Sequence, residues 1–501
     1  MDLKYPTHKF ICRYNTIAYL SKISFVYLVK PQNLQKEYDN IKKLPPGSVI
    51  AIIDDPFSSV CCSPYNYKNF LDLPNIDLCI SENWIDKPHS KLKLWPIGLE
   101  SRMIVNKQNL LKSVRRVNYK NKDRGILCNS HLATYPRPSS GYRDDRGDMI
   151  RQLKDHKLID FWRERKTQEE TFKITPTYKF SLCPEGNGLD THRFYETYLL
   201  GCQPIVRKGP LTDLHSQFTN TVVVDEWSDI KTQNLQVISK DNDYNMLNLD
   251  YWLYKYLRNK CRILTFFTGG IADEWRNLLY TIRQQGLEDL VVVFVLDEKA
   301  KLCAEKENSD GKITIRTDFL NSLDGLQESQ FAQKGFRDIM VYKIKSIVKM
   351  LEENYITFYL DCDVVLKNNI VKDYFTYTPK DIYFQSDDTN FVPNGGSCAG
   401  VMFIQPTKIM RNVFKEIVEK TKYRRVGTSD DQGVINDFRN NGKIPKDSWG
   451  ELSLHNYPNG PRYFNCTSNQ NNERIQLIHN NWIVGNKAKE ERFKQYGLWY
   501  I

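Results

Sequence analysis

The chain has 501 residues, of which 41% are hydrophobic, and this is enough to bury two or three separate cores. Lysine and arginine total 71 against 60 aspartate and glutamate residues, a formal net charge of +11, but the basic residues are scattered, which argues against a nucleic-acid-binding patch. The 12 cysteines form no CxxC pairs and no regular spacing, which argues against zinc ribbons and a dense disulfide framework.

The first 120 residues contain three short apolar runs that are typical of β-strands. They are Ser48–Ile53, Ile76–Ser81 and Leu92–Ile97. We expect them to form a small lobe of a Rossmann-type fold.

A second lobe is expected over residues 121–258, beginning with the strand Gly125–Cys128. Its clearest segment is 178–206, where a strand leads through a loop with one proline and two glycines into a helix that ends at Gly201, followed by a second strand. The start of such a helix offers backbone N–H groups to a phosphate. The basic, glycine-containing stretch Arg137–Arg151 lies within reach of the same ligand.

The strand, loop, helix and strand of 178–206 resemble the donor-binding half of GT-B glycosyltransferases of the exostosin-like group. The resemblance implies contacts to nucleotide and diphosphate from Glu185, Arg193 and Glu196. The alternative is that Arg193 is a surface charge and Glu196 an exposed helix residue. Two lobes in about 250 residues are short for this fold, so this half is either a compact transferase or a lobe without activity.

The boundary between the halves is expected near residues 227–259, where polar residues give way to an aromatic helix. No Pro/Ser-rich linker or charge block separates the two, so we expect packed domains. The predicted domains are 1–120, 121–258 and 259–501.

The second half opens with a βαβ pattern. Ile263–Gly270 is a predicted strand that runs into a glycine turn, Glu274–Gln285 has helical apolar spacing, and Leu290–Leu296 is a second, fully buried strand. A nucleotide pocket at the carboxyl ends of strands requires such a unit. A long helix, Arg337–Glu353, follows and carries Lys343.

The segment Ile356–Leu366 is the most informative stretch of the chain. An apolar strand pattern contains Asp361 and Asp363, which would project from the same side of one strand, with Cys362 on the other. Such a pair of carboxylates is a hard oxygen site for Mg²⁺ or Mn²⁺. In an acidic loop the same DxD pattern is usually a solvated turn.

Three later features belong to the same pattern. Gly395 and Gly396 precede an apolar strand at a point where the backbone must turn or approach another group closely. Asp431 and Gln432 open a predicted helix, for which the other reading is an N-cap with acidic residues that favour the helix dipole. His479 follows an apolar strand, with Lys487 shortly after it.

From Cys261 to the C-terminus these motifs resemble the GT-A fold and the family of nucleotide-diphospho-sugar transferases. The resemblance implies a metal held by Asp361, Asp363 and His479, with Mn²⁺ favoured over Mg²⁺ because imidazole is a softer ligand. It implies that Asp431 and Gln432 lie at the reacting sugar. The implied donor contacts come from Thr265, Lys343, Asp361, Gly395, Gly396 and Lys487.

The activity implied is transfer of a sugar from a nucleotide diphosphate, with a UDP-sugar as the default donor, to a hydroxyl of a glycan or glycoprotein acceptor. The Asp-Gln segment resembles that of enzymes that retain anomeric configuration. The fold expected for the whole chain is α/β, a GT-B-like pair of Rossmann-type lobes followed by a GT-A domain. Exostosin enzymes join a GT-B and a GT-A unit in one chain, and each unit adds a different sugar. The resemblance therefore implies that this chain could be a bifunctional enzyme.

Two other functions stay open. A haloacid-dehalogenase-like phosphatase also carries a strand that ends in DxD, but near the beginning of its domain, whereas here a complete βαβ unit comes first. A non-enzymatic protein that binds sugars or nucleotides would be built from degenerate transferase domains.

The N-terminus MDLKYPTHKF has no apolar signal region, and no run approaches 18 apolar residues. We therefore expect a soluble cytoplasmic protein without a membrane span, of microbial or viral origin.

Overall fold

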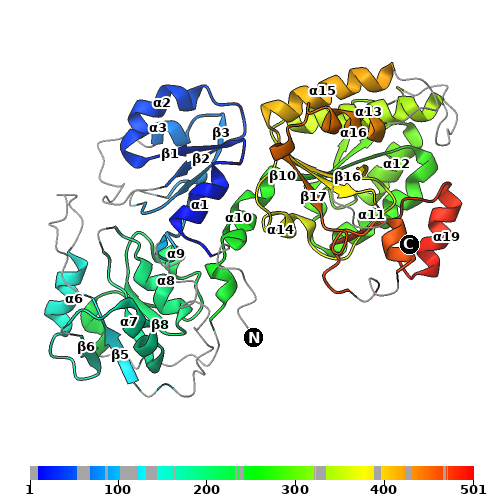
Figure 1. The fold of residues 1–501 in the computed structure, drawn as a ribbon. Helices are drawn as coiled ribbons and strands as arrows, with labels where there is room; N and C mark the ends of the chain where they lie inside the picture. Colours follow the sequence, from blue (N-terminus) through cyan, green and yellow to red (C-terminus); the bar gives the residue numbers. More distant parts are fainter. Residues whose placement is uncertain are drawn as a thin grey trace. The chain divides into compact units, whose positions relative to one another are not determined.

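The computed structural model describes the chain with several gaps. The described residues are 10–53, 68–84, 88–101, 122, 124–130, 144–162, 164–186, 188–231, 235, 242–320, 322, 334–388, 396–423, 431–466, 470 and 472–501. They belong to two compact units (Figure 1). The N-terminal unit spans Met1–Ser21 and Val26–Tyr256, and the C-terminal unit spans Lys22–Phe25 and Leu257–Ile501.

The first sheet of the N-terminal unit has four parallel strands in the order β1-β2-β3-β4. These strands are β1 (Val26–Val29), β2 (Ser48–Ile52), β3 (Ile76–Ser81) and β4 (Leu92–Leu94), and the helices beside them are α1 (Arg13–Leu20), α2 (Leu34–Lys42) and α3 (Lys68–Leu71). The core of this lobe joins apolar residues of α2, such as Leu34 and Ile41, to Ile50 and Ile52 of β2. The last strand ends at Leu94, short of the expected Leu92–Ile97. The N–H of Trp95 still donates to the carbonyl of Ser81 at 2.8 Å, but Pro96 has no N–H with which to continue the ladder.

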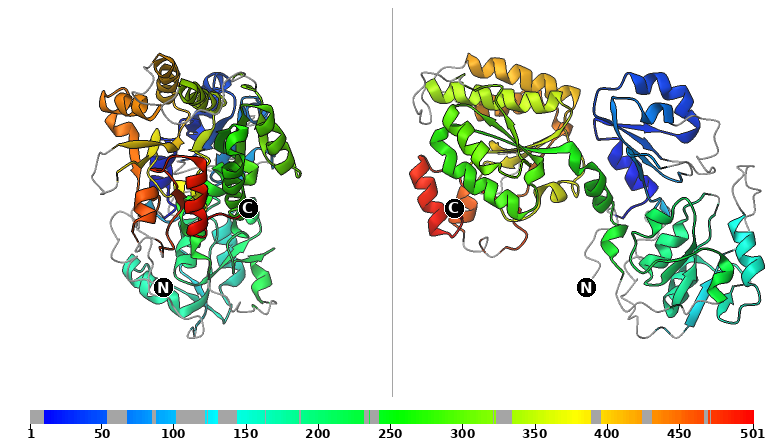
Figure 2. Two further views of the ribbon diagram at one scale, coloured as in Figure 1. Left: turned by 90° about the vertical axis from the view of Figure 1, so that its right-hand side faces the viewer. Right: turned by 180° about the vertical axis from the view of Figure 1, so that it is seen from behind.

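The second sheet of this unit has five parallel strands in the order β6-β5-β7-β8-β9. The strands are β5 (Arg124–Cys128), β6 (Ile159–Phe161), β7 (Tyr178–Leu182), β8 (Gln203–Arg207) and β9 (Val222–Val224). The helices are α6 (Asp145–Leu153), α7 (Gln168–Ile174), α8 (His192–Leu199), α9 (Thr212–His215) and α10 (Leu249–Leu257). Both sheets are therefore parallel and belong to an α/β architecture (Figure 2).

A buried aspartate ties the two sheets of the N-terminal unit together. Asp190 precedes α8, and its Oδ2 accepts the backbone N–H of Ile97 at 3.0 Å and the hydroxyl of Tyr195 at 2.6 Å. Its Oδ1 lies 3.1 Å from Nε2 of His215. Asn83, just after β3, accepts the backbone N–H of Asp190 at 2.8 Å. The loop before α8 is thus fixed to both lobes.

The C-terminal unit contains a mixed sheet of seven strands in the order β12-β11-β10-β13-β16-β15-β17. The strands are β10 (Cys261–Phe267), β11 (Val291–Val295), β12 (Thr314–Arg316), β13 (Ile356–Leu360), β15 (Ile382–Ser386), β16 (Ser397–Ile404) and β17 (Trp449–Leu452). Strand β16 is antiparallel to both of its neighbours, whereas the β12–β13 half is parallel.

Helices cover both faces of this sheet (Figure 1). One face is covered by α13 (Lys334–Glu352), α15 (Lys408–Lys422) and α16 (Asp431–Asn440), whose apolar residues share one core with alternate residues of the strands, such as Leu264 and Phe266. On the other face Phe267 stacks on Trp275 of α11 (Ala272–Gln284), with the ring centroids 4.5 Å apart. The remaining helices are α12 (Glu298–Glu307), α14 (Ile370–Tyr374), α17 (Gly460–Phe464) and α19 (Asn486–Gln495).

The DxD segment is divided between two sheets, which corrects the expectation of a single strand. Strand β13 ends at Leu360, and Val364–Leu366 forms β14, which pairs antiparallel with β18 (Leu477–His479) in a separate two-stranded sheet. The backbone N–H of Asp361 still bonds to the carbonyl of Gly400 at 2.8 Å, while the carbonyl of Asp363 accepts the N–H of Asn480 at 2.9 Å. The two aspartates therefore lie in a turn where the chain passes from one sheet to the other.

Among the described helices, none is both long enough and apolar enough to cross a bilayer.

Candidate active site

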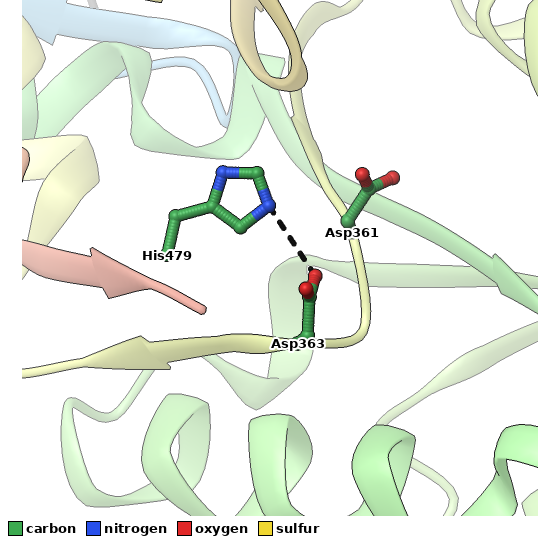
Figure 3. Close-up of side chains that lie close together, drawn as sticks. All are labelled: Asp361, Asp363 and His479. Atoms are coloured by element: carbon green, nitrogen blue, oxygen red, sulfur yellow. Dashed lines mark ion pairs between the residues drawn. The ribbon is translucent and has the colours of Figure 1, made fainter. Parts of the chain in front are cut away.

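Three side chains from the turn after β13 and the end of β18 converge. One ligand atom from each of Asp361, Asp363 and His479 lies within 4.8 Å of the others. Nε2 of His479 is 3.3 Å from Oδ1 of Asp363, as the dashed line in Figure 3 shows. Asp363 and His479 are buried, and Asp361 is partly exposed. The turn between the sheets thus brings the carboxylates to the histidine that ends β18.

The donor set and the space around it fit a divalent cation. Two carboxylates with one imidazole suit Mn²⁺, and they also accept Mg²⁺. The space beside them is kept open by Gly400 of β16, because a Cβ at that position would lie 2.4 Å from Cε1 of His479 and 2.5 Å from Oδ2 of Asp361. A side chain would fill the space that a bound ion needs.

Gln385, which the sequence analysis missed, fixes the imidazole of His479. Its Nε2 donates to the backbone carbonyls of Tyr457 at 3.0 Å and Pro458 at 3.2 Å. The amide oxygen must then face Nδ1 of His479, which lies 2.8 Å away and donates to it. Nε2 is therefore the ring nitrogen that faces the two aspartates, as a metal ligand requires.

The charges of this cluster are balanced internally. Burial opposes ionisation of Asp363, but Lys489 and His479 hold its pKa well below the usual range. Burial also disfavours the charged imidazole, yet the Asp363 carboxylate raises the pKa of His479 to about 10. A metal ion bound at Nε2 would displace the proton held there.

Lys489 is the lysine that contacts the Asp-Asp-His cluster. Its Nζ lies 2.8 Å from Oδ2 of Asp363. Lys487, which the sequence analysis named among the donor contacts, is 89% exposed and lies 4.0 Å from Glu491. Both lysines are in α19, and the local sequence does not show which of them faces inward. The donor-binding role of Lys487 stays a prediction.

Lys343 joins the DxD turn to α16. Its Nζ lies 2.9 Å from Oδ2 of Asp431 and 3.4 Å from Oδ1 of Asp361, and the same Oδ1 accepts the Tyr359 hydroxyl at 2.5 Å. Burial disfavours the charge of Lys343, but the two carboxylates raise its pKa above the usual value. The buried ammonium therefore holds Asp361 and Asp431 at one place.

Gln432 follows Asp431 at the start of α16, and both ends of its amide are engaged. Oε1 accepts the backbone N–H of Ala399 at 3.1 Å, and Nε2 donates to Oδ2 of Asp387 at 2.9 Å. Ala399 adjoins Gly400, so the Asp-Gln pair lies beside the acidic cluster. Asp387, directly after β15, is a second residue that the sequence analysis missed, because no local motif marks it.

The other residues predicted for the donor site lie as follows. Thr265 is buried within β10, and its hydroxyl is 3.5 Å from Sγ of Cys362. The carbonyl of Gly396 accepts the backbone N–H of Asp387 at 2.7 Å. Gly395 is outside the described residues. The donor-binding roles of these residues stay predictions.

The predicted site of the N-terminal unit lies at the carboxyl ends of β5, β7 and β8. Glu185 lines a small, open hollow there, together with residues that include Asp145, Arg207 and His215. Asp145 accepts the backbone N–H of Glu185 at 3.0 Å.

Two further residues were predicted for this site, both in α8. Arg193 donates to the side chain of Asn129, just after β5, and Glu196 follows one turn later. Part of the basic stretch Arg137–Arg151 is outside the described residues.

Fold and site together define the C-terminal unit as a mixed α/β unit with an Asp-Asp-His cluster at the carboxyl end of a central strand. Residues 286–493 match the sequence model of the nucleotide-diphospho-sugar transferase family. The C-terminal unit therefore carries a glycosyltransferase domain of this family. The matched residues lie in the C-terminal unit, so the exostosin-like GT-B resemblance of the N-terminal half stays a prediction.

Similar curated proteins are glycosyltransferases. The chain is 24% identical over 294 residues to a UDP-galactose:fucoside α-3-galactosyltransferase of Dictyostelium discoideum, an alignment that covers 49% of this chain and 44% of that protein. It is 26% identical over 246 residues to a UDP-D-xylose:L-fucose α-1,3-D-xylosyltransferase of Arabidopsis thaliana, which covers 45% of this chain and 66% of that protein. The alignments thus span less than two thirds of either relative.

Among solved structures, the galactosyltransferase LgtC aligns with 48% of this chain and 96% of its own, at 13% identity and a TM-score of 0.32.

Proposed function

We propose that the C-terminal unit transfers a sugar from a UDP-sugar to a hydroxyl of a glycan, in a reaction that depends on a divalent metal. The observation that carries the proposal is the convergence of Asp361, Asp363 and His479 inside the segment that matches a nucleotide-diphospho-sugar transferase family. These three residues would hold the ion, with Mn²⁺ favoured by the imidazole.

Each residue of the site then has a role. When bound, the ion would supply a Lewis acid for the charge that develops on the nucleoside diphosphate. Lys489 lies against Asp363 and adds a second positive charge on that side of the cluster. Lys343 holds Asp431 in place, and Asp431 would bind hydroxyls of the transferred sugar.

Retention of anomeric configuration is part of the proposal. Gln432 lies beside the cluster with its amide held between Ala399 and Asp387. A fixed amide suits the orientation of a reacting sugar better than the abstraction of a proton, because an amide is not a base. The acceptor hydroxyl would then lose its proton to the departing phosphate.

The names of the relatives favour a particular pair of substrates. One is a galactosyltransferase and the other a xylosyltransferase, and both act on a fucose residue. We therefore propose UDP-galactose or UDP-xylose as donor and a fucose-bearing glycan as acceptor.

The test measures UDP release and product formation with UDP-galactose and UDP-xylose, with methyl α-L-fucoside as acceptor, with and without Mn²⁺. Transfer that needs Mn²⁺ and is lost in Asp363→Asn would support the proposal. NMR of the product would report the configuration of the new bond. A phosphatase would instead release inorganic phosphate, and a binding protein would show neither activity.

The N-terminal unit is proposed as a second transferase, which makes the chain bifunctional. The observation in favour is the hollow beside Glu185, because ligands of parallel α/β sheets bind at the carboxyl ends of the strands. Its test is a panel of UDP- and GDP-sugars assayed with Asp363→Asn, in which the C-terminal site is disabled. Turnover of a second donor that is lost on adding Glu185→Gln would support the second activity, and no turnover would reject it.

A further inference from the structure

An exposed tryptophan lies close to the candidate active site. Trp482 is 62% exposed and comes three residues after His479. Its φ is 58°, in the left-handed region that residues other than glycine rarely adopt. A bulky residue keeps such a conformation only where its surroundings enforce it, and such residues cluster at ligand-binding sites.

The polar edge of the indole is fixed, whereas much of the side chain is left to solvent. Nε1 of Trp482 donates to Oδ1 of Asp387 at 3.0 Å, and Nδ2 of Asn481 donates to the same oxygen at 3.3 Å. The second oxygen of Asp387 accepts from Gln432. The carboxylate of Asp387 thus connects the exposed ring to Gln432, which lies beside the Asp-Asp-His cluster.

The turn that carries Trp482 is anchored at several points. The N–H of Asn480 donates to the carbonyl of Asp363 at 2.9 Å, and Arg492 donates to the carbonyl of Asn481 at 2.6 Å. The side-chain oxygen of Asn481 accepts the N–H of Gly460 at 2.7 Å. The ring is therefore positioned before any ligand arrives, which lowers the entropic cost of binding.

We propose that Trp482 is the platform of the acceptor-sugar subsite and that Asp387 is its polar contact. This inference rests on the proposed function, because it assigns the acceptor side of the same site. The face of an indole packs against the C–H face of a pyranose, and a carboxylate accepts hydrogen bonds from sugar hydroxyls.

The class of acceptor follows from the same two groups. Oδ2 of Asp387 accepts one hydrogen bond among the described residues, so an acceptor hydroxyl can use its other lone pair. A negatively charged sugar would be repelled by this carboxylate and by Asp388 next to it. The subsite therefore fits a neutral hexose or deoxyhexose at the end of a glycan.

The experiment compares Trp482→Ala and Trp482→Phe with the intact chain in the transferase assay. Loss of the ring should raise the acceptor KM about tenfold or more, whereas the Kd for UDP in the presence of Mn²⁺ should stay unchanged. Phenylalanine keeps an aromatic face but loses the bond to Asp387, so its KM should fall between the two. The uronic acid analogue of the acceptor should be a poor substrate for every variant.

Two exposed residues serve as controls. Val484→Ala changes a 70% exposed residue of the same segment, and Tyr423→Ala removes an 83% exposed aromatic ring after α15. Neither should change the acceptor KM. An unchanged acceptor KM in Trp482→Ala would overturn the inference while leaving the proposed function in place.

If the intact chain transfers no sugar, the proposed function fails and direct binding decides the inference. Saturation-transfer NMR with methyl α-L-fucoside and methyl β-D-galactoside would then be measured for the intact chain and for Trp482→Ala. Binding that is lost in the variant would support the subsite. No binding to the intact chain would reject it.

Discussion

At the scale of single residues, the candidate active site consists of buried groups that neutralise one another's charge. Asp363 lies between two cations, His479 and Lys489, and Lys343 lies between two carboxylates, Asp361 and Asp431. A buried charge without such a partner would be costly. Each substitution in the cluster should therefore change metal binding as well as catalysis.

Replacing Lys489 with methionine should strengthen Mn²⁺ binding in the absence of nucleotide, by severalfold, because the ammonium competes with the ion for Asp363. The measurement is a titration followed by the electron paramagnetic resonance of free Mn²⁺. Lys487→Met is the matched control, since this exposed lysine of the same helix lies at Glu491. An effect of Lys487→Met alone would assign the inward lysine to that position instead.

A methyl group at position 400 should remove the metal site. In Gly400→Ala the new Cβ would fall 2.4 Å from His479 and 2.5 Å from Asp361, so we expect Mn²⁺ affinity to fall at least tenfold. Gly396→Ala is the matched control, because its nearest contact would be an ordinary 3.5 Å to Asp387. The melting temperature of the metal-free variant separates loss of the site from loss of the fold, and unchanged Mn²⁺ affinity would contradict the role of Gly400.

At the scale of elements, loops at strand ends hold each site by long-range bonds. The loop before α8 is fixed through the side chain of Asp190, and the turn after β18 is fixed through the side chain of Asn481. In both cases a short polar side chain bonds to the backbone of a segment far away in the sequence. The loops are thereby held in place without secondary structure of their own.

Asp190→Asn should destabilise the N-terminal unit by on the order of 3 kcal/mol near neutral pH, because it removes the negative charge from the buried hydrogen-bond network that includes His215. Burial opposes the ionisation of Asp190, but its interactions with His215, Tyr195 and the backbone of Ile97 together outweigh burial and lower the pKa. A lowered pKa means that the carboxylate stabilises the fold above its unfolded pKa of about 3.9 and that this stability is lost as the pH falls.

The loss of stability of the N-terminal unit in Asp190→Asn, relative to the unsubstituted chain, should therefore be largest at pH 6–7 and shrink below about pH 4. Hydrogen exchange of peptides from β7 and β8, measured across this range, checks the prediction. A difference that does not vary with pH would mean that the charge of Asp190 does not contribute.

At the scale of the whole molecule, the chain enters the C-terminal unit twice. Lys22–Phe25 belongs to that unit, although the chain before and after it belongs to the N-terminal unit. Phe25 is 4% exposed, and the ammonium of Lys260 lies 5.6 Å from its ring centroid. The backbone N–H of Ser24 donates to the side chain of Gln405 at 3.3 Å.

Phe25→Ala should therefore destabilise the C-terminal unit, by about 3 kcal/mol, as is usual for a buried phenylalanine. Hydrogen exchange should become faster in peptides from β10 and β13 and stay unchanged in peptides from β5 and β7. Tyr14→Ala is a control, because Tyr14 is 62% exposed in the N-terminal unit. Faster exchange confined to the N-terminal unit would contradict the assignment of Lys22–Phe25.

The sequence alone determined much of the local structure of the second half. The strands β10 and β11 and the helices α11 and α13 lie where the apolar patterns predict them, because periodicity is a local property. The glycosyltransferase class of the C-terminal unit also followed from short motifs, and the family match supports it.

Only the tertiary structure decided how the site is assembled. The strand pattern of residues 356–366 continues through the DxD motif, and the break after Leu360 depends on pairing of β14 with β18, more than 100 residues later. Lys489, Gln385 and Asp387 meet the site through contacts with distant segments, and Gly400 matters because of what surrounds it. Local patterns predict elements, whereas the charges and spaces of a site depend on how distant elements pack.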